Sequence, residues 1–465
     1  MGTVYAKSVD QDADKESVRK SDRIDLQSLK AQVQRVHVAG IGRTKEDIII
    51  SSVKDVFSAN NFQSVVLKIH EARSRLEELG CFKGVDVLID TYEGSDALTD
   101  GIQVTFEVEE VKVLGAQANT AVGQNEALFN GGAALRNILG RGEHCTVSYG
   151  RGTKKTTAFA VTAVKPIHDR FRSRVTSSVH QSSLEAGWSG YKLLERGAAL
   201  GVTFNTTPTT SHELTAEAAW RHLSCLSKTT AFGVREHSGH TLKTSIRYCV
   251  SVDTRDQHIF PTRGHLLRAQ TEAAGYGGNV GFSKSELQLQ ANQALAGELS
   301  FDVVSAGELP FDVVTQVSLS LGHLAPLGSK GFTIADRFFM GGPTTFRGFQ
   351  MGGVGPHSDK CALGAQSYWL GSAHAYAPLP LLPRGSFVDR FRLHAWASAG
   401  TLADPAAGGA DAAANLAARM SLGAGVAVNV GGVARVELNY CVPVRHRPWD
   451  KTQPGLQLGI AADVL

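Results

Sequence analysis

The most informative segment of the sequence is IADRFFMGGPTTFRGF, from Ile334 to Phe349, which is followed by a glycine-rich run from Gly352 to Pro356. Prolines and closely spaced glycines interrupt helices and regular strands alike, so the sequence predicts one long loop over residues 334–356. Loops of this length usually have a function or are disordered. Because the loop is apolar and aromatic with Arg347 at its tip, we expect it to be ordered and functional.

The composition restricts the classes of protein to which the chain can belong. No stretch of the 465 residues approaches the run of about 18 apolar residues that a spanning helix needs. The chain is therefore either soluble or a membrane β-barrel, whose alternating strands escape hydropathy plots. The 47 basic and 44 acidic residues are spread along the chain, which argues against nucleic-acid binding. Six scattered cysteines without a C-x-x-C pair predict isolated reduced thiols.

From about residue 115 onward the chain has a β pattern. Between residues 421 and 442, apolar residues such as Leu422 and Leu438 alternate with polar or small ones such as Arg435 and Glu437. A soluble sandwich gives the same alternation. The length favours a barrel, because about 350 residues, at roughly 20 to 22 for each strand with its turn, give about 16 strands. Five of the predicted strands follow the long loop.

One segment of this region is nearly duplicated. Residues Ala296–Ser305 (AGELSFDVVS) are followed by Ala306–Thr315 (AGELPFDVVT), within a run from 285 to 321 in which most of the large apolar residues have odd numbers. An insertion of even length leaves every side chain on its own face of a strand. We therefore interpret the repeat as a tolerated local duplication.

The N-terminal part has a different character. Residues 1–32 mix acidic and basic residues without apolar periodicity, which predicts a flexible tail. Residues 33–113 predict strand, helix, helix, strand and strand, with Phe62, Val65, Ile69 and Leu76 on one helix face. This is the pattern of a small α+β domain. The tail has no apolar core for a secretory signal, and its acids argue against a cleaved mitochondrial presequence.

Three motifs in the loop carry a family resemblance. They are Asp336-Arg337-Phe338, the turn Gly341-Gly342-Pro343 and the tip Arg347-Gly348-Phe349. Together they resemble the sixth loop of the outer-membrane barrel assembly (BamA-like) superfamily, which includes the bacterial barrel insertase and the chloroplast import channel. Over nearly its whole length the chain is most similar to the mitochondrial branch, the core subunits of the sorting and assembly machinery.

The resemblance implies a mainly β protein. One POTRA domain would occupy residues 33–113, and a transmembrane β-barrel of about 16 strands would occupy residues 115–465. The barrel would lie in the mitochondrial outer membrane, with the POTRA domain in the intermembrane space. There a sheet edge would accept an incoming strand, or the domain would be a spacer that positions partners.

The implied function is insertion of β-barrel precursors, such as porin and the import pore, into the lipid bilayer. Implied partners are accessory subunits of the sorting and assembly complex and the inner-membrane organising (MICOS) proteins that bridge the two membranes. A passive or polypeptide-conducting channel is the alternative, although a simple porin needs neither residues 33–113 nor the looped Arg347 tip. A soluble β-rich binding protein is the third hypothesis.

The two ends of the barrel predict a weak seam. A precursor strand needs a ladder edge in the membrane, because each unpaired backbone group costs several kcal/mol there. The predicted first-strand region, residues 119–139, contains Gly123, Gly131 and Gly132, and glycine weakens a strand. The alternative is that these glycines merely shape the barrel wall. In the terminal strand, Gln457, Gly459, Ala462 and Val464 resemble the mitochondrial β-signal.

Arg347 needs a partner if it lies inside the barrel. Superfamily resemblance implies that the loop tip folds back onto inward residues of the later strands. By alternation Arg435 and Glu437 face inward, so we predict that Glu437 pairs with Arg347.

Motifs for catalysis and for metal or cofactor binding are missing from the sequence. The stretch GRGTKKT (150–156) lacks the glycine that a P-loop has before its lysine, and no nucleophile turn or metalloprotease helix occurs. His237 and His240 stand in a β region without further ligands. We therefore expect no enzyme activity, no cofactor and no metal site.

Overall fold

The computed structural model describes residues 29–123, 126–153, 156–167, 171–295, 313–379, 390–404, 417–432 and 434–461. Most of the predicted tail, the first copy of the duplication and most of the second, and the positions Ala462 and Val464 lie outside these residues. The chain divides into two compact units, the first over residues 1–42 and 46–110 and the second over residues 43–45 and 111–465.

The N-terminal unit is a small α+β domain. Its elements in chain order are β1 (Gln32–Ala39), α1 (Glu46–Val53), η1 (Lys54–Ser58), α2 (Phe62–Glu78), β2 (Phe82–Thr91) and β3 (Gly101–Glu110). The strands form a sheet in the order β1-β3-β2, parallel between β1 and β3. Asn61 is the N-cap of α2, and its side chain accepts from Ser64 N in a capping box. The buried Val65, Ile69 and Leu76 pack with the sheet in one core, as their spacing predicted.

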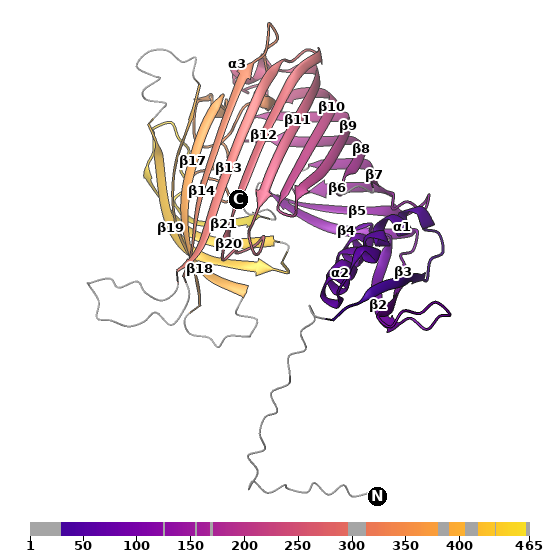
Figure 1. Ribbon diagram of the computed structural model, residues 1–465. Helices are drawn as coiled ribbons and strands as arrows, with labels where there is room; N and C mark the ends of the chain where they lie inside the picture. Colours follow the sequence, from indigo (N-terminus) through magenta and orange to yellow (C-terminus); the bar gives the residue numbers. More distant parts are fainter. Residues whose placement is uncertain are drawn as a thin grey trace, which may run out of the picture. The chain divides into compact units, whose positions relative to one another are not determined.

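The second unit is built on one antiparallel sheet of 16 strands (Figure 1). The first eleven are β4 (Leu114–Gly123), β5 (Glu126–Arg136), β6 (His144–Gly152), β7 (Thr157–Pro166), β8 (Arg174–Ala186), β9 (Tyr191–Thr207), β10 (Thr210–Cys225), β11 (Gly239–Asp253), β12 (Gly264–Gly278), β13 (Phe282–Leu295) and β14 (Val313–Pro326). After the long loop come β17 (Ser367–Pro378), β18 (Phe391–Ala403), β19 (Arg419–Val430), β20 (Ala434–Arg445) and β21 (Gly455–Ala461). The strand number and the five strands after the loop agree with the sequence prediction.

Smaller elements lie between these strands. Helix α3 (Phe232–Arg235) precedes β11, and the loop after β14 holds η2 (Ile334–Asp336) and the hairpin of β15 (His357–Ser358) and β16 (Cys361–Ala362). Among the described residues, no helix is both long and apolar enough to cross a membrane.

The two faces of the large sheet have inverted polarity. Exposed apolar side chains include Leu114, Phe129, Val147, Val179, Leu200, Val317, Leu438, Tyr440 and Leu456. Buried polar side chains of the same sheet include Arg221, Lys243, Glu272, Gln290, Asn292, Gln316, Arg435, Glu437 and Asn439. A membrane barrel shows this arrangement, with an apolar outer wall and a polar interior. The odd-numbered residues of β13 and β14 face outward and the even-numbered Gln290, Asn292 and Gln316 inward.

The expected first strand over residues 119–139 is wrong. Strand β4 already begins at Leu114 and pairs with β5, so that region contains parts of two antiparallel strands. Gly123 ends β4, whereas Gly131 and Gly132 lie on the second strand of the barrel. The hairpin could not be recognised in this run of alanines and glycines. Strand ends are predicted from the alternation of large apolar and polar residues, and small residues do not show it.

Candidate functional site

The long loop packs as a core of its own. Phe338, Met340, Phe346 and Phe349 are buried with residues of the strands around them, and the rings of Phe346 and Phe349 lie 4.7 Å apart between centroids. Gly341, with φ +126°, could not be another residue, because a Cβ there would lie 2.1 Å from the carbonyl oxygen of Gln350. The motif glycines thus allow the backbone to fold tightly on itself.

The loop tip ends in a buried ion cluster. Arg347, with 2 % exposure, directs Nη2 and Nε at Glu437 Oε2, at 2.7 and 3.0 Å. On the other side of the same carboxylate, Arg435 Nε lies 2.6 Å from Oε1. Asn439 also donates to Glu437, and the Arg347 guanidinium lies 5.5 Å from the centre of the Trp396 ring. The structure therefore brings together Arg347 and Glu437, the pair expected from the sequence.

Burial and charge act in opposite directions on Arg347. Burial alone would lower the pKa of its guanidinium, but the adjacent Glu437 carboxylate raises that pKa above its ordinary value. Arg347 is therefore a permanent cation, and one buried carboxylate is shared by two arginines. Such a cluster is strongly destabilised if the carboxylate is removed.

The tip also contacts the terminal strand. Gly348 N donates to Gln457 Oε1 at 3.0 Å, and Gln453 N donates to Gly348 O at 2.8 Å. Gly459 lies so close to the loop turn that a Cβ there would be 3.1 Å from Pro343 O. The structure thus brings Gln457 and Gly459, two residues of the predicted terminal-strand signal, against the loop motif.

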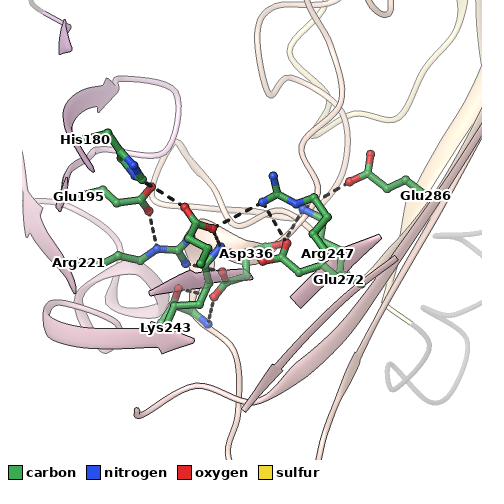
Figure 2. A network of polar contacts seen from close by, with 11 residues as sticks. His180, Glu195, Arg221, Lys243, Arg247, Glu272, Glu286 and Asp336 are labelled. Carbon is green, nitrogen blue, oxygen red and sulfur yellow. Dashed lines mark hydrogen bonds and ion pairs between the residues drawn. The ribbon is translucent and has the colours of Figure 1, made fainter. Parts of the chain in front are cut away.

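A second buried network holds the start of the loop, as Figure 2 shows. Asp336 Oδ1 lies 2.7 Å from Arg221 Nη1, while Oδ2 accepts from Thr333 N and Oγ1. Arg221 Nε in turn donates to Glu195 at 2.6 Å. Ser421 Oγ on β19 also donates to Arg347 O. The loop is therefore anchored to β10 at its start and to β19, β20 and β21 at its tip.

The neighbouring motif residues pack beside this anchor. Phe338 stacks edge-on against Tyr368 with ring centroids 4.8 Å apart, and Lys284 Nζ lies 4.4 Å from the centre of the Phe338 ring. Arg337 lies 3.8 Å from the carboxylate of Asp404. All three residues of the Asp336-Arg337-Phe338 motif thus contact the barrel strands or the loops that join them.

A third anchor was not predicted from the sequence. Arg419 pairs with Asp450 at 3.1 Å, with both side chains almost fully buried, and Gly355 N donates to Asp450 Oδ1. This pair fixes the end of the loop. Its signal in the sequence was weak, because Asp450 follows β20 outside any alternating pattern.

Strands β4 and β21 are the two ends of the sheet. They lie next to each other, but across the described residues no ladder pairing joins them. Gly132 is required by packing, since a Cβ would lie 2.2 Å from Val147 O on β6. A Cβ at Gly131 would meet no atom within 4 Å. Gly132 therefore shapes the barrel wall, whereas space does not require a glycine at position 131.

Comparisons with known proteins agree with this geometry. Residues 137–463 match the model of the Omp85 superfamily domain. The chain is 40% identical to the sorting and assembly machinery component 50 homolog of Xenopus tropicalis, with 99% of both chains covered. It is 41% identical to the Homo sapiens homolog, with 93% and 90% covered.

Solved structures share the fold. BamA from Haemophilus ducreyi lacking POTRA domains 1–3 superposes with a TM-score of 0.73 at 15% identity, covering 93% of this chain and 84% of that one. CdiB from Acinetobacter baumannii gives a TM-score of 0.56 at 10% identity, with 93% and 74% covered.

Proposed function

The chain belongs to the Omp85 superfamily and, within it, to the family of sorting and assembly machinery component 50 homologues, and from this we propose that it inserts β-barrel precursors into the mitochondrial outer membrane. The observation that carries the proposal is the pair of sheet ends, β4 and β21, which are adjacent but not joined by a ladder. A precursor strand that enters there finds unpaired backbone groups of β4, which supply the hydrogen bonds that hydrocarbon does not.

The long loop holds the strands on one side of this seam in place. It holds β21 from the inside through Gly348 and Gln457 and fixes the neighbouring β20 through Arg347 and Glu437. With the terminal strand held, opening of the seam frees the edge of β4 while the rest of the wall stays paired. Gly459 fits against Pro343 without a side chain. An incoming strand with the same pattern would compete with β21 for these contacts.

The N-terminal unit receives precursors or positions partners in the intermembrane space. Its sheet leaves β1 and β2 as edges, to which an extended segment can add as a further strand. The partners we propose are accessory subunits of the sorting and assembly complex and inner-membrane organising proteins. The protein acts by pairing and release rather than by bond chemistry, so we propose no enzyme activity.

Import into isolated mitochondria tests this function. Mitochondria depleted of their own insertase and supplied with this chain should again fold a radiolabelled porin precursor into a protease-resistant form. As a control, the glycine of the β-signal in the precursor's terminal strand is replaced by a charged residue. This precursor should remain protease-sensitive in the same mitochondria. If the chain assembles in the outer membrane but the intact precursor stays unfolded, the insertase function is wrong.

A further inference from the structure

We propose that the inner wall of the barrel binds a zinc ion between His180 on β8, Glu195 on β9 and Glu217 on β10. All three side chains face the interior of the sheet, with 23%, 18% and 14% of their surface exposed. They are close enough to the surface for an ion and a water molecule to reach them. Imidazole nitrogen and carboxylate oxygen are ligands that zinc takes in proteins.

The distances between the His180 nitrogen and the two glutamate oxygens fit ligands of one metal ion better than hydrogen bonds. His180 Nε2 lies 3.6 Å from Glu195 Oε1 and 3.7 Å from Glu217 Oε1, and the three ligand atoms all lie within 4.8 Å of one another. Hydrogen bonds between nitrogen and oxygen are shorter, at about 2.7 to 3.2 Å. Ligands on a tetrahedral zinc at about 2.1 Å are separated by about 3.4 Å. Small side-chain movements therefore complete three corners of a tetrahedron.

Each carboxylate already has its other oxygen fixed. Glu195 Oε2 lies 2.6 Å from Arg221, and Glu217 Oε2 lies 3.0 Å from Lys243 (Figure 2 shows Glu195, Arg221 and Lys243). These contacts orient the Oε1 atoms toward His180. Partners of this kind around a ligand are the ordinary second layer of a metal site.

A glycine makes room for the imidazole. Gly197 lies opposite His180 in the ladder, and a Cβ at Gly197 would be 2.9 Å from the ring carbon Cε1 and 3.0 Å from Nε2. The ring therefore lies across β9, where it reaches toward β10. A side chain at position 197 would push the ring away from Glu217.

The charges of the network favour a bound cation. Its four carboxylates are Glu195, Glu217, Glu272 and Asp336, and its three basic groups are Arg221, Lys243 and Arg247. Lys284 and Glu286 beside them cancel each other. The carboxylates of this set thus outnumber its basic groups by one, which favours a cation beside the Oε1 atoms.

Titration calorimetry with zinc chloride tests the site in the full chain, purified in detergent, dialysed against a chelator and freed of its native cysteines. We expect one zinc per chain. His180→Ala leaves the pairs of Glu195 with Arg221 and of Glu217 with Lys243 in place, and it should weaken binding by about tenfold or more. Gly197→Ala, which removes no ligand, should also weaken it. His212→Ala, at the edge of the barrel wall on β10, is the matched control and should bind as the parent does.

Visible absorption after addition of cobalt chloride is a second measurement. It would not depend on His180 if this residue had only a structural role. The parent should show the visible absorption of tetrahedral cobalt, and His180→Ala should lose it. Zinc should also raise the thermal midpoint of the parent and not that of His180→Ala. If the parent binds no zinc, or if His180→Ala and Gly197→Ala bind zinc as tightly as the parent, the cluster is an ion-pair network only and the proposal is wrong.

Discussion

At the scale of single residues, Glu437 is the group on which the loop tip depends. Its two oxygens face Arg347 and Arg435 at 2.7 and 2.6 Å, and all three side chains are no more than 3% exposed. Two buried guanidinium groups with one carboxylate already carry an excess of positive charge. Removing that carboxylate leaves both cations uncompensated.

Glu437→Gln should therefore destabilise the barrel by about 3 to 5 kcal/mol, because breaking a buried ion pair costs that much. The midpoint of thermal unfolding in detergent would measure it. The control is Glu213→Gln, which changes an exposed glutamate on β10 and should leave the midpoint almost unchanged. Adding Arg347→Gln to Glu437→Gln should recover part of the loss. A Glu437→Gln protein as stable as the control would show that the pair does not matter.

Glu437 could be predicted from the sequence because the alternation along β20 determines which side chains face inward. That Arg435 shares the carboxylate could not be predicted. Alternation shows on which face of the sheet a side chain lies, but not which rotamer it adopts there. Arg221 and Glu195 were missed for a different reason. Arg221 links Glu195 to Asp336, which lies in a loop more than a hundred residues further along the chain, and no periodic pattern relates a loop residue to a strand.

At the scale of elements, the loop is held at both ends. Its start is fixed by Asp336 to Arg221, and its tip by Arg347 to Glu437. The Arg419–Asp450 pair, which holds Gly355, is a third anchor, so one anchor can be lost while the loop stays inside the barrel. The first two anchors also divide the loop into a start on β10 and a tip on the last three strands.

Asp336→Asn should loosen the start of the loop without releasing its tip. Arg221 keeps Glu195 as partner, so we expect a loss of about 1.5 to 3 kcal/mol, the range for a hydrogen bond to a charged group. Limited trypsin digestion should then cut after Arg337 and not after Arg347. Cleavage after both residues, or after neither, would contradict two independent anchors.

Gln457→Leu should release the tip from the terminal strand. It removes the acceptor of the buried Gly348 N, which costs about 1 to 3 kcal/mol when left unpaired. Leu456→Ile, one residue earlier on the outer face, is the control. Hydrogen exchange should become faster in β21 and at the loop tip in Gln457→Leu alone. Equal exchange in both variants would mean that Gln457 does not hold β21.

Elements were predicted with uneven success. The strands after the loop and the helix from Phe62 were found, because large apolar residues mark their faces. The first hairpin was misplaced, because alanine and glycine fill both faces of β4 and β5. The zinc ligands were not found either, since they come from three strands and share a site only through the register of the ladder.

At the scale of the whole molecule, the sheet of the second unit is inverted relative to a soluble protein. Its exposed face is apolar and its buried face is polar and charged. Closing such a sheet satisfies the backbone groups of its edge strands in a bilayer. Across the residues that the structure describes, no ladder joins the adjacent strands β4 and β21. The proposed insertase activity resides at that seam.

Disulfide trapping during import tests this central claim most directly. In a cysteine-free chain, single cysteines at Ala116 or Ala118 of β4 would be paired with single cysteines along the terminal strand of a porin precursor. If β4 templates the incoming strand, crosslinks should advance in register, one residue for one residue, and none should form to Val179 on the outer wall of β8. Crosslinks that are absent at β4 but plentiful at the interior residue Asn439 would contradict it, because the barrel would then conduct precursors rather than template them.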